Sequence, residues 1–95
     1  MLHTLRHSPF QSDISSLLPY LQAGDALLLI EDGVIAALAN SAVLKILLQH
    51  PITVYALRED VDARGLSAHI SDKISCVGYP EFVKLVVKHQ QHFAW

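Results

Sequence analysis

The chain has 95 residues, of which 52% are hydrophobic and 17% are charged, with a formal net charge of −2. No run approaches the roughly 20 apolar residues of a membrane span, the one cysteine excludes an internal disulfide framework, and the lack of a Lys/Arg run argues against direct binding to a nucleic-acid backbone. So apolar a composition in so short a chain predicts that other subunits cover part of its surface.

The opening residues also bear on where the protein works. MLHTLRHSPF lacks the long apolar core and the small-residue cleavage site of a signal peptide. The lone Cys76 suits a reducing compartment. We therefore expect a cytoplasmic protein without membrane contact, and the length predicts one domain over residues 1–95.

The first elements follow from apolar runs and helix signals. Residues 2–5 predict a short strand. Ser12 is positioned to cap a helix whose apolar residues repeat over 14–21 and which ends at Gly24. Pro19 inside it predicts a kink or an early stop near Leu18, because proline lacks the N–H that a helix interior needs. The continuous apolar run ALLLI over 26–30 predicts a strand covered on both faces.

The middle of the chain repeats the alternation of helix and strand. Residues 34–49 favour one helix, whose wide apolar face implies burial against more than one surface. Residues 52–57 form the third predicted strand, 60–65 a single helical turn with Asp60 as N-cap, and 74–77 a fourth, short strand.

A last helix is expected to open at Pro80, where the fixed φ of proline is favourable. The tail QQHFAW predicts either a fifth short strand or an arm onto a partner. Strands alternating with helices and joined by short turns indicate an α/β fold around a mostly parallel sheet of four to five strands.

The most concentrated set of charges follows the third strand, in VYALREDVDARGL. Past the carboxyl end of a parallel strand is where open α/β proteins usually bind ligands. The spacing pairs Asp60 with Arg64 and Arg58 with Asp62 at i,i+4, the order that favours helical ion pairs. The segment contains no nucleophile, so we interpret it as a candidate partner interface, formed by Arg58, Glu59, Asp60, Asp62 and Arg64.

Three other chemistries can be considered. Glu31 and Asp32 after the second strand could hold Mg²⁺, but turn and capping roles explain them more simply. Cys76 is the one potent nucleophile, yet it falls inside a predicted buried strand, which favours an inert core thiol. The six histidines show no spacing that declares a zinc site. We therefore assign no catalytic, cofactor-binding or metal-ligating residue.

Several segments together resemble one family. The opening MLHTLRHSP, GDALLLIEDGV, VYALREDVDARGL, YPEFVKLVVKH and the terminal Trp95 are similar to the TusB/DsrH family, the B-type subunits of a tRNA 2-thiouridine sulfur relay. The resemblance covers nearly the whole chain. It implies a DsrE/DsrF/DsrH-like three-layer α/β/α fold, with Trp95 added to the candidate interface.

The resemblance also implies a function. Family members assemble with two homologous sister subunits, C-type and D-type, in a dimer of heterotrimers that receives persulfide sulfur from carrier proteins. The transferring cysteine belongs to the D-type subunit, and no thiol stands in the comparable loop here. The resemblance therefore implies a non-catalytic subunit without a cofactor. Two alternatives stay open: a sulfurtransferase that carries persulfide on Cys76, and a subunit of a related sulfur-oxidation complex.

Overall fold

The computed structural model describes residues 1–10 and 14–95. Within them the chain forms five strands: β1 (Leu2–Leu5), β2 (Ala26–Leu29), β3 (Thr53–Leu57), β4 (Ser75–Val77) and β5 (His92–Ala94). Three α-helices accompany the strands: α1 (Ala42–Leu47), α2 (Arg58–Ala63) and α3 (Tyr79–Lys88). Four short 3-10 helices complete the set: η1 (Ile14–Ser16), η2 (Leu18–Tyr20), η3 (Glu31–Ala37) and η4 (Ser67–His69).

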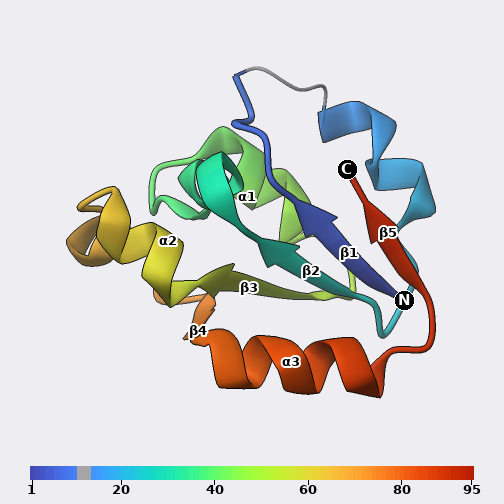
Figure 1. The fold of residues 1–95 in the computed structure, drawn as a ribbon. Coiled ribbons are helices and arrows are strands. Elements are labelled where there is room, and N and C mark those ends of the chain that lie inside the picture. Colours follow the sequence, from blue (N-terminus) through green and yellow to red (C-terminus); the bar gives the residue numbers. More distant parts are fainter. Residues whose placement is uncertain (11–13) are drawn as a thin grey trace.

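All four strand pairings of the described sheet are parallel, and the order is β4-β3-β2-β1-β5 (Figure 1). The central strand β2 carries only aliphatic side chains, all buried, as expected for a strand covered on both faces. The tail forms a strand, so of the two alternatives for QQHFAW the strand is confirmed. The predicted α/β fold with a parallel sheet is confirmed as well.

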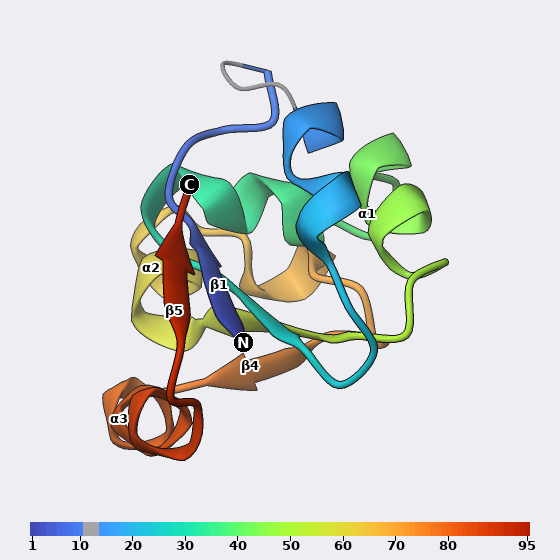
Figure 2. The same cartoon turned by 90° about the vertical axis from the view of Figure 1, so that its right-hand side faces the viewer.

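Helical segments cover both faces of the sheet, which gives the three layers that the resemblance implies (Figures 1 and 2). One face packs against η1, η3, α1 and α2 in the larger core. In the part of the chain that the structure describes, the other face packs against α3, through Phe82 and Leu85. The helical layer on this face consists of α3, which contributes no fully buried residue.

The prediction of one long helix over 34–49 is wrong. Leu38 is extended, forms an antiparallel bridge with Ile70, and separates η3 from α1. Ser41 then restarts the helix, because its Oγ accepts a hydrogen bond from the Leu44 N–H at 3.2 Å. A local turn and a distant bridge therefore override the helical preference of the segment.

Two other boundaries differ from the prediction. The helix expected over 14–21 consists of the two short helices η1 and η2, with Pro19 in the first turn of η2, so the predicted break is confirmed. The proposed Ser12 cap lies outside the described residues. Asp60 is not an N-cap, because β3 passes directly into α2 at Leu57 and leaves Asp60 in the first helical turn.

Candidate functional site at the carboxyl edge of the sheet

Opposite charges connect the segments that follow β2 and β3. Arg64 at the end of α2 donates from Nε and Nη2 to the same Asp32 oxygen, at 3.1 and 2.9 Å. Its Nη1 donates to the Asp60 carbonyl at 3.1 Å and lies 3.9 Å from the Asp60 carboxylate, the predicted i,i+4 pair. The guanidinium thus joins α2 to η3 instead of facing an open site.

Asp60 makes a second connection between these segments. Its Oδ2 accepts a hydrogen bond from the backbone N–H of Glu31 at 2.7 Å. Glu31 has a φ of 51°, a left-handed conformation that is costly for a residue with a side chain. The Asp60 carboxylate therefore stabilises a strained turn directly after the central strand.

Arg58 does not make its predicted ion pair. Among the described residues no pair joins it to Asp62; its Nη2 instead donates to the Cys76 carbonyl at 2.9 Å. This bond links the start of α2 to the edge strand β4. The Glu59 carboxylate also lies near the start of α3. Its Oε2 is 3.5 Å from the position that a Cβ would take on Gly78, the residue directly before that helix.

Cys76 lies in the middle of β4, as predicted, but β4 is an edge strand and Cys76 is half-buried, so the prediction that this strand is buried is wrong. Its side chain packs against the larger core. Arg58 of the charged cluster bonds to the carbonyl oxygen of Cys76 and not to its sulfur.

Trp95 lies apart from the charged cluster. It follows β5, which forms the opposite edge of the sheet from β4. Its indole Nε1 donates to Nδ1 of His3 at 3.1 Å, and its ring stacks on Phe93 with centroids 4.4 Å apart. The six residues predicted as one interface therefore divide into two places.

A buried polar network around His3 and Asp25 was missed by the sequence prediction. His3 is fully buried on β1, and its Nε2 lies 2.9 Å from an Asp25 oxygen. Asp25 also accepts hydrogen bonds from the Met1 ammonium at 2.9 Å and the Gln22 N–H at 3.0 Å. A histidine inside an apolar strand was the available signal, because a buried polar side chain requires a partner.

The network controls the ionisation of Asp25. Burial opposes its charge, but hydrogen bonds from His3, the N-terminal ammonium and Gln22 outweigh that cost and lower the pKa of Asp25 from 3.8 to about 2. Asp25 is therefore a carboxylate at any pH at which the protein would work.

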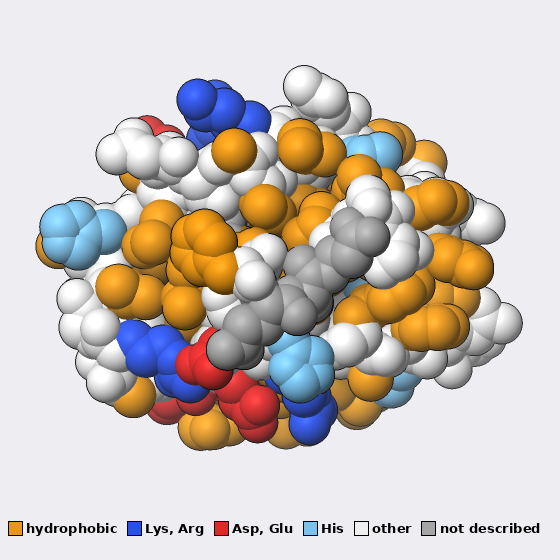
Figure 3. All heavy atoms as spheres, turned by 90° about the horizontal axis from the view of Figure 1, so that it is seen from above, with side chains coloured by type: hydrophobic (Ala, Val, Ile, Leu, Met, Phe, Trp, Pro, Cys, Tyr) orange, Lys and Arg blue, Asp and Glu red, His pale blue; other side chains and the backbone are white. Residues whose placement is uncertain are grey.

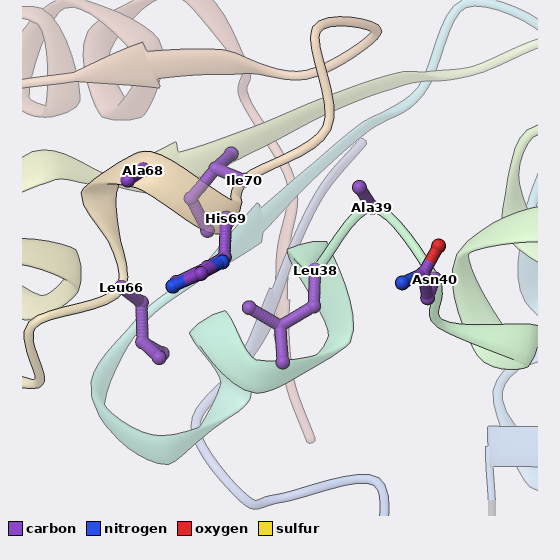
Figure 4. Close-up of a pocket in the computed structure, with 7 residues that line it drawn as sticks. All are labelled: Leu38, Ala39, Asn40, Leu66, Ala68, His69 and Ile70. Atoms are coloured by element: carbon purple, nitrogen blue, oxygen red, sulfur yellow. The ribbon is translucent and has the colours of Figure 1, made fainter.

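Two of the surface recesses lie away from the charged cluster and have no Asp, Glu, Lys or Arg in their lining. One, of about 390 Å³, is lined by residues around the Leu38–Ile70 bridge, and His69 is the one titratable side chain lining it (Figure 4). The other, of about 500 Å³, is mostly apolar and includes Phe10 and Val43. Seen from above, hydrophobic side chains cover much of the surface (Figure 3). Neither recess contains a group of catalytic side chains.

The described residues offer little to a metal ion. No group of three or more His, Cys, Asp or Glu side chains in residues 1–10 and 14–95 is placed to hold one. Asp32, one of the two candidate magnesium ligands, is bonded to Arg64 instead. The described part of the chain also contains no helix long and apolar enough to cross a membrane.

The Asp32–Arg64 pair is expected to contribute modestly to stability. Both side chains are partly exposed, so a double-mutant cycle of Asp32→Asn and Arg64→Ala should give a coupling of about 0.5 kcal/mol. Urea unfolding of the four proteins measures it. Asp62→Asn, which changes an exposed carboxylate on the same helix, is the control and should show no coupling to Arg64→Ala. A coupling as large between Asp62 and Arg64 would contradict this assignment.

A five-stranded parallel sheet whose carboxyl edge holds internally paired charges, and whose single thiol lies on an edge strand, defines a small α/β protein. The family described as DsrH like protein matches residues 7–92. The chain is 54% identical to Protein TusB of Erwinia tasmaniensis and 52% identical to Protein TusB of Serratia proteamaculans, over all of both chains in each case. The chain belongs to the TusB/DsrH family.

Solved structures share the fold. The ychN protein from E. coli superposes with a TM-score of 0.76 at 17% identity, covering 99% of this chain and 97% of that one. Protein Tm0979 from Thermotoga maritima superposes with a TM-score of 0.69 at 27% identity, covering 96% and 97%. At 17% identity the likeness to the E. coli protein concerns the fold alone.

Proposed function

We propose that this chain is a non-catalytic subunit of a cytoplasmic sulfur-relay complex that supports 2-thiolation of the wobble uridine of tRNA. Membership of the TusB/DsrH family supports the sulfur-relay theme. The observation that carries the non-catalytic role is the charged cluster, where both Arg58 and Arg64 are committed to bonds within the chain. That cluster occupies the position where a reactive loop would be useful, and it holds no thiol.

The proposed partners are two homologous sister subunits, of C-type and D-type, in a dimer of heterotrimers. The D-type subunit would supply the transferring cysteine, and sulfur carriers would bind through the complex. Helix α3 supports a subunit role, because Tyr79, Val83 and Val87 on it are 52%, 60% and 78% exposed. Exposed apolar side chains in a row are typical of a surface that another protein covers.

The candidate interface residues belong to this proposal. Arg58, Glu59, Asp60, Asp62 and Arg64 would present a charged rim to a neighbouring subunit, and the internal bonds of Arg58, Asp60 and Arg64 would fix its shape. Trp95 would act at a different place, on the β5 side of the sheet. Charges held in fixed positions at an interface contribute more to the choice of partner than to the strength of binding.

Cys76→Ser tests the non-catalytic role. We expect cells that carry this variant as their only copy to keep normal 2-thiouridine, because the half-buried Cys76 thiol takes no part in transfer. Liquid chromatography with mass spectrometry of tRNA nucleosides measures it, with deletion of the gene as the control that should lose the modification.

Two outcomes would count against the proposal. Loss of 2-thiouridine in Cys76→Ser, with the complex still assembled, would show that the thiol carries sulfur. Unchanged 2-thiouridine in the deletion strain would instead favour a related sulfur-oxidation complex.

A further inference from the structure

The hydrogen bonds of His3 fix the tautomer of its neutral imidazole ring. The indole N–H of Trp95 can only donate, so Nδ1 of His3 must accept that bond at 3.1 Å. The proton of the neutral ring is therefore on Nε2, from which it is donated to Asp25 at 2.9 Å. His3 is fully buried, and this tautomer satisfies both of its nitrogens.

The strand that carries Trp95 has few other attachments. β5 pairs with β1 alone, and all three of its residues are exposed. The bonds that flank the strand run from the Leu2 N–H to the Gln91 carbonyl and from the Trp95 N–H to the Thr4 carbonyl, at 2.9 and 2.8 Å. Trp95 packs against His3 and against Tyr20, whose ring centroid is 5.4 Å away. Phe93 on β5 also contacts the rings of His3 and Tyr20, and within this aromatic cluster the Trp95 indole N–H supplies a hydrogen bond to β1.

We propose that β5 and Trp95 form a strap on the edge of β1, and that a proton taken up by His3 releases it. A second proton on the imidazole would occupy Nδ1. Two N–H groups would then face each other across 3.1 Å in a buried site, and the indole would lose its acceptor. The inference rests on this geometry and is independent of the proposed function.

Other charged groups face the same region and must be separated from His3. The Asp25 carboxylate contacts His3, the Met1 ammonium contacts Asp25, and Asp25 stays ionised because its pKa is about 2. Lys88 and His89 stand at the end of α3. Burial lowers the pKa of His89, and the N-terminal ammonium, Lys88 and His92 lower it further.

His92 connects the strap to α3. Its Nε2 lies 2.9 Å from the Val86 carbonyl and 2.8 Å from the His89 carbonyl, so it donates to the end of the helix. Protonation leaves that donor in place, since both nitrogens of an imidazolium carry hydrogen. His92 is therefore expected to hold α3 under the conditions that free Trp95.

Release of the strap would change the surface of the molecule. The outer backbone edge of β1, which β5 now occupies, would become available to a strand from another chain. The availability of this edge of β1 to another strand would thus depend on pH.

The intact wild-type protein provides a direct test, because Trp95 is the only tryptophan and gives one indole N–H signal. NMR of nitrogen-15-labelled protein would follow that signal and the ring nitrogens of His3 from about pH 8 to about pH 5, the range in which histidines usually change charge. We expect the indole proton to lose its protection from exchange as the pH falls, while the backbone amides of β2 and β3 keep theirs. An indole signal that stays protected until the whole sheet unfolds would overturn the proposal.

Variants identify the responsible group. His3→Gln should abolish the dependence of the indole signal on pH, whereas His89→Gln and His92→Gln should preserve it. A pH response that disappears in His89→Gln or His92→Gln but persists in His3→Gln would contradict the assignment to His3. If His3→Gln does not fold, the site-resolved titration of the wild-type ring nitrogens still decides the question.

Discussion

Gly33→Ala should destabilise the protein more than any other single methyl addition to a glycine. A Cβ at this position would lie 2.0 Å from the Leu5 carbonyl oxygen and 2.8 Å from its carbon, both backbone atoms of β1. The same oxygen accepts the Ile30 N–H at 3.0 Å, so it cannot move without disturbing the register of β1 and β2. We expect a loss of about 3 kcal/mol or more, measured as a lower urea midpoint.

Gly24→Ala is the matched control. Gly24 has a φ of 88°, but no atom lies within 4 Å of the position a Cβ would take. The cost should therefore come from backbone strain alone, about 1 kcal/mol. Equal losses in the two variants would show that η3 is not packed against β1 as described.

Asp25→Ala is the second large effect. It removes the carboxylate that the buried His3, the Met1 ammonium and the Gln22 N–H share, and leaves the His3 Nε2–H without an acceptor. We expect the free energy of unfolding to fall by about 2–3 kcal/mol. Asp72→Ala, which truncates an exposed carboxylate, should change it by less than about 0.5 kcal/mol.

The same carboxylate predicts a dependence on acid. Because the folded pKa of Asp25, about 2, lies below its ordinary value of 3.8, its contribution is present above the ordinary value and is lost as pH falls toward 2. Urea titrations between about pH 5 and pH 2 should show this loss in the wild type, and Asp25→Asn should show less of it. An identical acid dependence in both proteins would place the stabilising charge elsewhere.

Much of the fold could be predicted because its strands are distinct apolar runs. ALLLI has no polar alternation, and it is the central, doubly covered strand β2. The interruption near Leu18 follows from Pro19 by local stereochemistry. The break at Leu38 could not be predicted in this way, since it depends on a bridge to Ile70, more than thirty residues later.

The candidate sites show the same limit. The i,i+4 spacing correctly paired Asp60 with Arg64, because that contact is local. The stronger contact of Arg64, with Asp32, depends on the neighbouring positions of β2 and β3. The His3–Asp25 network likewise requires the register that places Leu2 opposite Ala26. Position along the chain therefore indicated the cluster and its one local contact, but not the bonds that join separate segments.

The most direct test of the account is the mass of this subunit during sulfur transfer. The chain would be co-expressed with the proposed partners, a C-type and a D-type sister subunit, and the purified assembly would be supplied with a persulfide donor and sampled by intact-mass spectrometry. The account predicts a heteromeric assembly in which a sister subunit gains sulfur while this chain keeps its mass. A gain of one sulfur atom on this chain, mapped to Cys76, would contradict it.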